Sequence, residues 1–303
     1  MSAQRVLVTG AGGQLGGYLC PALGRAGHEV IGLGRAPAAE VDLAVDITDP
    51  AAVESALRET RPDVVIHAAA YTDVDGCELH PERAEAVNHH GARYVADAAR
   101  AAGAWVLAIG TDFVFAGDAH VPYREDAAVG PISAYGASKL RGEQAVLAAD
   151  GRFAVARTAW VFGGAGKHFP RTVLTVMRER GTMTVVDDEI GSPTFAGDLA
   201  EALVAVLAHR PSGILHLTNE GAVSRFGFAR AIARAAGYDP AAIRPTTTAE
   251  FLAQHPLPAR RPAFSALANT RAAALGVRLP PWEDAVRRYV PRLAAELGGE
   301  RAA

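Results

Sequence analysis

The sequence predicts an α/β protein built on a doubly wound parallel sheet, with a smaller α/β domain toward the C-terminus. In the first half of the chain, short apolar runs alternate with Ala-rich stretches of helical length, which is typical of a parallel sheet covered on both faces. A glycine-rich turn joins the first apolar run to the first helical stretch. After Trp160 the alternation weakens, because Pro193, Pro211 and the prolines between 256 and 262 interrupt shorter elements. We therefore expect the second domain to begin there.

The elements of the first half are expected in order along the chain. Strands are predicted at 5–9, 29–33, 64–67, 105–110 and 153–157, and helices near 15–25, 50–59, 84–102 and 134–149. The second helix has its own start signal, since Asp49 can accept hydrogen bonds from free amides and Pro50 suits the first helical position. No internal repeat or long linker is present, so we expect the two parts to pack as one unit with a cleft between them.

The composition excludes several classes of protein. The 303 residues are 50% hydrophobic and 21% charged, which is typical of a globular chain rather than a disordered or fibrous one. The formal net charge is -3 and no basic stretch is dense, so neither nucleic acid nor a membrane is an expected partner. The first residues lack the apolar core of a signal peptide, and no run reaches about 18 apolar residues. We expect a cytoplasmic protein, either a monomer or a homodimer.

No metal site is predicted. Cys20 and Cys77 lie far apart and outside any zinc-binding spacing, and they are not expected to form a disulfide. The ten histidines contain no His-Glu-x-x-His motif. The adjacent His89 and His90 are expected to point to different sides of a helix rather than to one metal ion.

The glycine-rich turn is the first functional signal. Gly10, Gly13 and Gly16 stand between the first strand and the first helix. A side chain at the tight turn or at the closest approach would keep a pyrophosphate away from the free amides at the helix N-terminus. In this strand-turn-helix setting, the pattern predicts a Rossmann-like domain that binds a dinucleotide.

Arg35 bears on the choice of dinucleotide. It stands where the second strand ends, about 20 residues beyond the glycines, at the position where an acidic residue would bind the ribose of NAD. A guanidinium can bind a 2′-phosphate through two parallel hydrogen bonds. The sequence therefore favours NADPH as the cofactor and leaves NADH possible.

Tyr135 and Lys139 form the second functional signal. They stand four residues apart at the start of a predicted helix, so both side chains project from one face. With seven tyrosines and two lysines in the chain, only about 0.05 Tyr-x-x-x-Lys pairs are expected by chance. A free phenol titrates at about 10, and a neighbouring ammonium favours the phenolate, which brings the group toward the range of acid–base catalysis.

Thr111 directly follows the strand predicted at 105–110. Residues just past the carboxyl end of a parallel strand face the crevice in which ligands bind. We expect its hydroxyl to hydrogen-bond a substrate carbonyl oxygen beside Tyr135. Thr111, Tyr135 and Lys139 are therefore the predicted catalytic residues.

Together these residues resemble a known family. The glycine-rich turn, the threonine and the Tyr-x-x-x-Lys pair are similar to those of the extended short-chain dehydrogenases/reductases, and within them the dTDP-4-dehydrorhamnose reductases. The segments that carry the closer resemblance are 10–16, 68–75, 86–88, 111–115, 135–143, 157–162, 187–194 and 258–262. We expect residues 1–158, with parts of about 190–218, to form an NADP-binding Rossmann domain. Residues 159–189 and 219–303 are expected to bind the sugar nucleotide.

The resemblance implies a reaction. NADPH would deliver hydride to carbon 4 of a dTDP-bound 4-keto-6-deoxy sugar, most directly converting dTDP-4-dehydro-L-rhamnose to dTDP-L-rhamnose. Tyr135 would protonate the new alkoxide and Thr111 would orient the carbonyl. Lys139 would hold the nicotinamide ribose and lower the pKa of Tyr135.

The resemblance also implies binding residues. Asn88 would help to place Lys139, and Asp46 would accept a hydrogen bond from the adenine amino group. The expected cofactor-binding residues are Gly10, Gly13, Gln14, Leu15, Gly16, Arg35, Asp46, Ile47, Ala68, Ala69, Ala70, Tyr71, Asn88, Tyr135 and Lys139. The expected substrate-binding residues are Val74, Asp112, Phe113, Trp160, Phe169 and Arg260, the last of which would pair with the diphosphate.

The chain departs from the family pattern in three places. Gly110 and Phe113 stand where serine and tyrosine are common, which removes two hydroxyls near the reacting sugar. His168 stands where the family often has asparagine. Some members dimerise through a magnesium ion held by glutamates, one of them just after the glycine turn, but Gly17 stands at that point here. No bridging metal is therefore expected.

Three other functions are alternatives. Another NDP-4-keto-6-deoxysugar reductase, for example of a secondary-metabolite pathway, would keep the catalytic residues and differ in its pocket. A dehydratase or epimerase of the same fold is disfavoured, because Phe113 leaves Asp112 without the acidic partner that elimination needs. A non-catalytic subunit, such as the regulatory partner of methionine adenosyltransferase, is disfavoured because Thr111, Tyr135 and Lys139 are all present.

Overall fold

A seven-stranded parallel sheet organises the first part of the molecule. The structure is a computed structural model that describes residues 3–164 and 166–299, and within these residues the strand order is β11-β6-β5-β4-β1-β2-β3. This order confirms the predicted doubly wound α/β fold. The strands are β1 (Arg5–Thr9), β2 (Glu29–Gly34), β3 (Leu43–Ala44), β4 (Val64–His67), β5 (Trp105–Thr111), β6 (Ala154–Thr158) and β11 (Gly213–His216). The five predicted strands lie within one residue of their expected bounds, and the edge strands β3 and β11 are additional.

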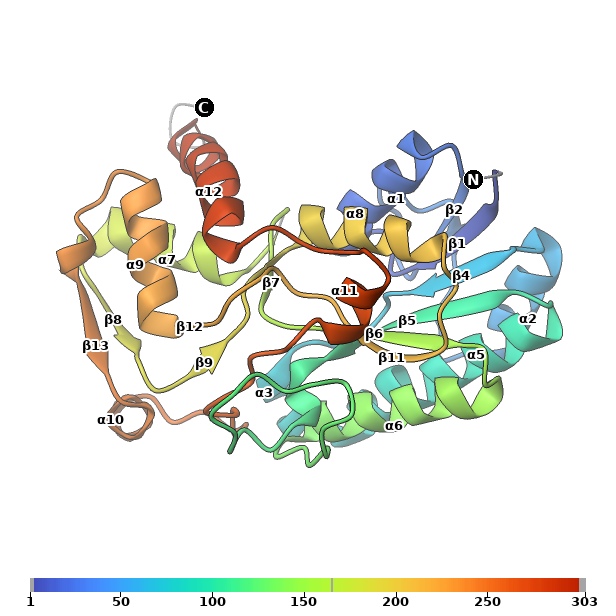
Figure 1. The fold of residues 1–303 in the computed structure, drawn as a ribbon, viewed down its shortest axis with the longest axis horizontal. Helices are drawn as coiled ribbons and strands as arrows, with labels where there is room; N and C mark the ends of the chain where they lie inside the picture. Colours follow the sequence, from blue (N-terminus) through green and yellow to red (C-terminus); the bar gives the residue numbers. More distant parts are fainter. Residues whose placement is uncertain (1–2, 165, 300–303) are drawn as a thin grey trace.

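Helices cover both faces of this sheet (Figure 1). α1 (Gly16–Arg25) and α8 (Ala196–Leu207) pack together on one face, whereas α2 (Pro50–Thr60), α5 (Ala92–Ala101) and α6 (Ala134–Ala149) pack together on the other. Because the sheet is buried on both sides, its inner strands are mostly apolar, with polar residues chiefly near their ends. Shorter helices join these layers: α3 (Val74–Leu79), α4 (Pro81–Ala84), the 3-10 turn η2 (Asp112–Val114) and α11 (Thr270–Ala274).

Two local features concern the start of α2 and the course of the helix expected near 84–102. Asp49 accepts hydrogen bonds from the amides of Ala51 and Ala52 at 3.0 and 3.2 Å, so the predicted cap of α2 is present. The helix expected near 84–102 is composite, because a π-helical segment, η1 (Glu85–Gly91), lies between α4 and α5. A π-helical segment shifts the face that each residue presents, and such segments are frequent at functional sites.

The second lobe has a hydrophobic core of its own. Helices α7 (Phe169–Arg180), α9 (Arg225–Ala235) and α12 (Trp282–Gly299) enclose a cluster that contains Phe162, Phe228 and Tyr289 and is separate from the core around the sheet. Short strands pair two by two beside it. They are β7 (Val161–Phe162) with β10 (Thr194–Phe195), β9 (Ile190–Gly191) with β12 (Val223–Ser224), and β8 (Met183–Val186) with β13 (Ile243–Thr246). The 3-10 turn η3 (Pro240–Ala242) and α10 (Thr248–Gln254) complete the lobe.

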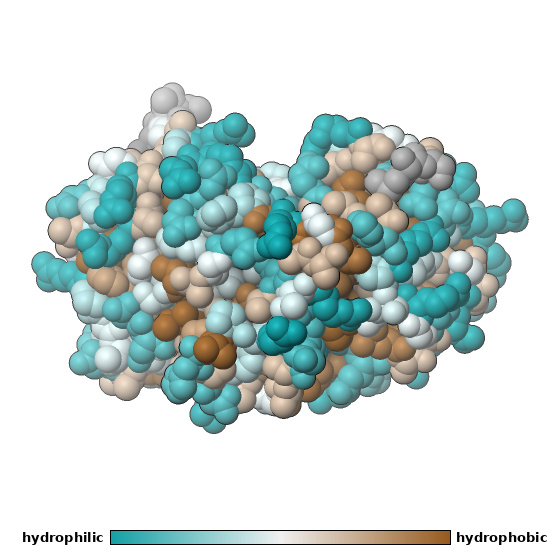
Figure 2. Space-filling model, in the orientation of Figure 1, coloured by the Kyte–Doolittle hydropathy of each residue, from teal (hydrophilic) through white to brown (hydrophobic). Residues whose placement is uncertain are grey.

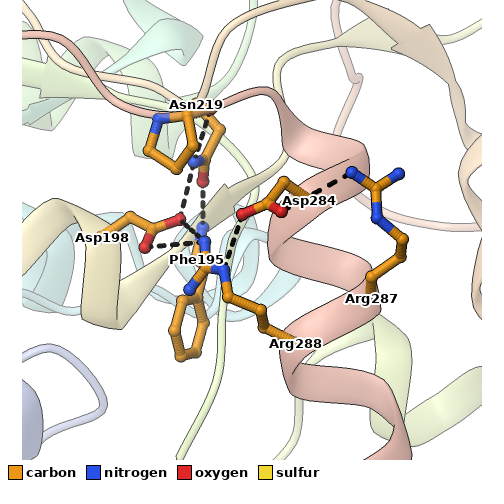
Figure 3. Close-up of polar contacts among 7 residues, drawn as sticks. Phe195, Asp198, Asn219, Asp284, Arg287 and Arg288 are labelled. Carbon is orange, nitrogen blue, oxygen red and sulfur yellow. Dashed lines mark hydrogen bonds and ion pairs between the residues drawn. The ribbon is translucent and has the colours of Figure 1, made fainter.

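A polar network joins α12 of the second lobe to α8 of the sheet lobe (Figure 3). Arg288 places Nη2 2.7 Å from Asp198 Oδ2 and Nε 2.6 Å from Asp284 Oδ2. Asn219 donates to the Asp198 carboxylate at 2.8 Å and to the Pro280 carbonyl at 2.9 Å. These contacts hold the two lobes together at one side of the molecule.

The surface is mostly hydrophilic on the face that Figure 2 shows. Hydrophobic residues form small, separate patches there, and a notch lies between the two lobes. No helix within residues 3–164 and 166–299 is long and apolar enough to span a membrane. Cys20 and Cys77 are buried and unpaired, as their spacing predicts.

Buried histidines make the stability of the fold depend on pH. Burial lowers the pKa of His67 and of His216 to about 3, and that of His168 to about 4. The unfolded chain takes up protons on these residues below about pH 6.5, whereas the folded chain does not until the pH is much lower. Their contribution to stability is therefore present above about pH 6.5 and is lost as the pH falls toward 4.

Replacing His216 by glutamine is expected to make this acid-induced loss shallower. Between pH 6.5 and pH 5, the free energy of unfolding of the variant should fall by roughly 2 kcal/mol less than that of the wild type. Urea titrations at a series of pH values measure the difference. His209→Gln, at an exposed histidine, is the matched control and should follow the wild type. An unchanged slope in His216→Gln would contradict the assignment.

Candidate active site

A cavity of about 750 Å³ lies between the carboxyl ends of the central strands and the second lobe. Gly10, Ala68, Thr111 and Thr158 bring the ends of β1, β4, β5 and β6 to its wall, and Trp160 brings the second lobe. The strand order reverses between β1 and β4, which is the point where open α/β sheets bind their ligands. The predicted cleft between the two parts is therefore present.

The glycine turn forms an open cradle at the N-terminus of α1. Gly10 has a φ of 71°, and a Cβ there would lie 2.8 Å from backbone atoms of Ala69. A Cβ on Gly16 would overlap the Ala11 carbonyl, so the helix packs directly on the turn. Among the described residues no side chain caps α1, and its first turn carries no acidic residue, so no side chain neutralises the positive end of the helix dipole. These residues fit the pyrophosphate of a dinucleotide.

The residues expected at the adenosine end lie at the edge of the sheet, outside the cavity wall. Arg35 is exposed just after β2. The pKa of Asp46 is below its usual value, because the Thr48 amide and hydroxyl donate to its carboxylate at 2.9 and 2.8 Å and the Arg35 charge adds to their effect. Ile47 is buried against Gly91 of η1. Arg35 and Asp46 therefore lie close enough to interact through their charges.

The three predicted catalytic residues converge in the cavity, and all three are buried. Ser133 caps α6, which places Tyr135 in the first turn and Lys139 one turn later on the same face. Lys139 Nζ donates to the Ile109 carbonyl at 2.8 Å and so ties α6 to β5 just before Thr111. Helix α6 and strand β5 therefore hold all three groups rigidly.

Burial shifts the pKa values of Tyr135 and Lys139 in opposite directions. Burial raises the pKa of Tyr135 above its usual value, and the Thr111 hydroxyl opposes this rise. Burial lowers the pKa of Lys139, and the Glu143 carboxylate opposes that change. Desolvation therefore sets the direction of the Tyr135 shift, and the expected effect of Lys139 on the phenol pKa stays a prediction. Tyr135 is therefore a neutral phenol, which is the form that a proton donor needs.

Asn88 lies one layer behind these residues, on η1. Its Oδ1 accepts from the Tyr71 amide at 2.8 Å, and its Nδ2 donates to the Tyr71 carbonyl at 3.0 Å and the Ser138 hydroxyl at 3.1 Å. Asn88 thus fastens the loop after β4 to helix α6, next to Lys139. The π-helical geometry that places it there had no signal in the sequence.

The same segment corrects the expectation for His89 and His90. Their rings do not point apart but stack, with centroids 4.5 Å apart and planes 29° from parallel, because a π-helix turns less per residue than an α-helix. With Glu85 they form a group whose possible ligand atoms lie within 4.8 Å of one another. The Glu85 carboxylate is already paired with Arg141 and His89, so this group is engaged in ion pairs.

Most of the predicted site residues reach the cavity. Those that line it are Gly10, Gly13, Gln14, Leu15, Ala68, Ala70, Val74, Thr111, Asp112, Phe113, Tyr135, Lys139, Trp160 and Phe169. Those that do not line it are Gly16, Arg35, Asp46, Ile47, Ala69, Tyr71, Asn88 and Arg260. Arg260 is exposed, and its neighbour Arg261 lines the cavity instead.

Gln14, His168 and Phe113 have contacts that the sequence did not indicate. Gln14 Nε2 donates to the Gly163 carbonyl at 2.9 Å, so the glycine turn is tied to the second lobe. His168 caps α7 and lies 2.9 Å from the Tyr289 hydroxyl, which gives it a structural role within the second lobe. Phe113 packs edge-on against the ring of Tyr135, at a centroid distance of 5.4 Å.

A buried ion pair beneath the site was missed. Glu143 and Arg157 are each 4% exposed, and Arg157 donates twice to Glu143 Oε2, at 3.0 and 2.9 Å. A Cβ on Gly110 would overlap the other carboxylate oxygen of Glu143, so the glycine at this position leaves the room that the carboxylate occupies. Glu143 stands one turn after Lys139 on α6, and this spacing could have indicated its position beneath the site.

Asp112 is the buried acid next to Thr111. The Thr111 hydroxyl donates to Asp112 Oδ1 at 3.1 Å, and burial raises the pKa of this carboxyl to about 6. Asp112 Oδ2 has no hydrogen-bond partner among the described residues. A buried acceptor of this kind, at the cavity wall, is suited to a ligand hydroxyl.

Comparison with known proteins identifies relatives along nearly the whole chain. Residues 4–295 match the RmlD substrate binding domain family. The dTDP-4-dehydrorhamnose reductase of Mycobacterium tuberculosis is 43% identical over 291 residues, which cover 94% of this chain and 91% of that protein. A Streptomyces antibioticus protein named as a probable dTDP-4,6-dihydroxy-2-methyloxan-3-one 4-ketoreductase is 40% identical over 294 residues, which cover 96% of each chain.

A solved structure has the same fold. The dTDP-4-dehydrorhamnose reductase of Bacillus anthracis, in complex with NADP, is 34% identical, with a TM-score of 0.87 over 95% of this chain and 99% of that one. These matches confirm the resemblance that the motifs indicate. The chain therefore belongs to the RmlD substrate binding domain family, among the relatives of the dTDP-4-dehydrorhamnose reductases.

Proposed function

We propose that the protein uses NADPH to reduce the 4-keto group of a dTDP-4-keto-6-deoxy sugar, and that this substrate is dTDP-4-dehydro-L-rhamnose. The observation that carries the proposal is the convergence of Thr111, Tyr135 and Lys139 with the glycine cradle in one cavity. The names of the relatives from M. tuberculosis and B. anthracis support the same reaction and the same cofactor.

The two lobes divide the binding between them. Residues 1–158, with parts of about 190–218, hold the cofactor, and residues 159–189 and 219–303 hold the sugar nucleotide. Within these ranges, residues 1–2, 165 and 300–303 lie outside the described residues. The packing of α8 against α1 and the pairing of β11 with β6 support the return of the chain to the first lobe. When bound, NADPH supplies the hydride that reduces the carbonyl carbon.

The residues of this chain prepare the carbonyl and provide the proton. The Thr111 hydroxyl hydrogen-bonds the carbonyl oxygen, and the neutral Tyr135 phenol gives its proton to that oxygen as negative charge develops. The Lys139 ammonium binds a ribose hydroxyl and stabilises the phenolate that remains. The loop fastened by Asn88 keeps the cofactor next to these groups. Because the site is buried, each of these interactions is stronger than in water.

Oxidation of NADPH with dTDP-4-keto-6-deoxyglucose tests the proposal. The reaction is run with and without a 3,5-epimerase, which generates the dehydrorhamnose form. Turnover that needs the epimerase and gives dTDP-L-rhamnose is the expected result. Turnover without the epimerase would contradict the assigned substrate, and no turnover under either condition, with NADPH still bound, would contradict the reaction itself.

A second candidate is the reduction of a different 4-keto dTDP-sugar. The relative from S. antibioticus has the name of such an enzyme, and Gly110 and Phe113 remove two hydroxyls that the family commonly has near the sugar. The configuration at carbon 4 of the product, determined by NMR, distinguishes the two candidates.

Arg35→Ala tests the assignment of NADPH. The variant is expected to raise the KM for NADPH by at least about tenfold, because a bidentate contact with the 2′-phosphate is lost. The KM for NADH should change little, since NADH has no phosphate there. Steady-state kinetics with both cofactors measure the effect, and an equal loss for both would contradict the 2′-phosphate assignment.

A further inference from the structure

Arg225 is a cation on the cavity wall that no sequence motif indicated. It is the first residue of α9, whose cap Ser224 fixes the start of the helix, and its amide donates to the Glu189 carbonyl at 3.0 Å. Its guanidinium carbon lies 3.5 Å from the ring centroid of Trp160 and 5.3 Å from that of Phe169. The guanidinium therefore makes cation–π contacts with two aromatic rings, both of which line the cavity.

The indole under this guanidinium has one fixed position. Trp160 has a φ of 46°, a left-handed conformation that is uncommon for a bulky residue and costs free energy. Gly191 permits its packing, because a Cβ there would overlap the indole ring. The backbone of Trp160, the missing side chain at Gly191 and the stacked Arg225 thus define one wall of the cavity.

Within residues 3–164 and 166–299, the Arg225 guanidinium has an ion pair with Glu189. Its Nε to Oε2 distance is 3.7 Å, longer than an ordinary hydrogen bond, so this pair leaves the guanidinium able to donate to a ligand. Arg261, also on the cavity wall, differs, since it donates to the Ala259 carbonyl at 2.8 Å and to Asp75 at 2.7 Å. The Arg225 side chain is 22% exposed and lines the cavity, so its guanidinium is accessible to a ligand there.

The charges around Arg225 indicate what kind of oxygen it binds. Burial lowers the pKa of Arg225, and the carboxylates of Glu189 and Asp112 oppose that change. Glu189 is itself 8% exposed. A diphosphate placed here would be repelled by both carboxylates, whereas a hydroxyl both accepts and donates hydrogen bonds. Arg225 as donor and Glu189 as acceptor therefore complement neighbouring hydroxyls on a sugar ring.

We infer that Arg225 is a specificity-determining residue, whose guanidinium, lying flat on Trp160, donates hydrogen bonds to hydroxyl oxygens of the substrate hexose. The inference rests on the proposed function, and it assigns a substrate contact that none of the predicted residues supplies. The position of Arg225 relative to the reacting carbonyl follows from Asp112. Asp112 is next to Thr111 in the chain and is close enough to Arg225 for their charges to interact. Arg225 thus binds the sugar close to the carbonyl that is reduced.

The test compares ligands with and without the hexose. For Arg225→Met, which keeps an apolar chain on Trp160 but has no donor, the KM for the dTDP-4-keto sugar is expected to rise at least about tenfold. The Kd values for dTDP and for NADPH should be unchanged, because neither ligand contains the hexose. Arg225→Lys, which keeps the charge but not the planar fork, should recover only part of the lost affinity.

Arg234→Met is the matched control, because Arg234 is exposed on the same helix, and its kinetics should equal those of the wild type. Equal weakening of dTDP and of the dTDP-sugar in Arg225→Met would overturn the inference in favour of a diphosphate contact. Unchanged constants for both would remove Arg225 from the binding site.

If Arg225→Met does not fold, Arg225→Lys and Glu189→Gln allow the same comparison of dTDP with the dTDP-sugar. A wild-type protein without turnover contradicts the proposed function, whereas an active wild type with an unaffected Arg225→Met contradicts only this inference.

Discussion

Replacing Tyr135 by phenylalanine is expected to lower kcat by about a hundredfold to ten-thousandfold, the range typical of a lost general acid. The variant lacks the phenol that we propose as the proton donor, while Phe fills the same buried space against Phe113. NADPH binding should be largely retained, because the glycine cradle is unchanged. Steady-state kinetics and the Kd for NADPH, measured by fluorescence, test both parts.

Tyr94→Phe is the matched control for this prediction. Tyr94 lies on α5, outside the cavity wall, and the loss of its hydroxyl should leave kcat unchanged. Full activity in Tyr135→Phe would exclude the phenol as the proton donor. A large loss of NADPH affinity would instead indicate that Tyr135 acts mainly in binding.

Replacing Arg157 by methionine is expected to destabilise the fold by about 3–5 kcal/mol, because it leaves the Glu143 carboxylate buried without its cation. Both side chains are 4% exposed, so water cannot replace the lost partner. The pKa of Glu143, which burial raises and Arg157 opposes, should rise further in the variant. The free energy of unfolding, from urea titrations, measures the effect.

Two further variants control this result. The double variant Glu143→Leu with Arg157→Met removes both charges and should recover most of the lost stability. Arg25→Met, which breaks the exposed pair with Glu201, should cause no measurable change. If Arg157→Met were as stable as Arg25→Met, the buried pair would contribute nothing to the fold.

The core strands and helices were predictable because their signals are local. β1, β4 and β5 each contain a continuous apolar run, and this pattern needs no knowledge of their neighbours. The edge strand β11 was not predicted, since its four residues become a strand only by pairing with β6, more than fifty residues earlier. The π-helical segment η1 was also missed, because nothing in its composition distinguishes it from an ordinary helix.

The residues of the candidate site likewise divide into those that the sequence indicated and those that it did not. Gly10, Tyr135 and Lys139 were found because their spacing within one turn or helix already implies the chemistry. Arg225 and Glu189 were not found, because they face each other from different elements and neither belongs to a motif. Arg260 was named in place of Arg261, since the sequence does not show which of two neighbouring side chains turns toward the cavity.

The sequence by itself determined the doubly wound sheet and predicted the glycine cradle and the Tyr135–Lys139 pair, since each depends on residues a few positions apart whose spacing sets their geometry. Only the tertiary structure decided the direction of the Tyr135 pKa shift, the stacking of Arg225 on Trp160 and the pairing of Glu143 with Arg157. These depend on burial and on contacts between segments far apart in the chain. Desolvation and long-range packing arise only when the chain has folded, and for this reason no local pattern encodes them.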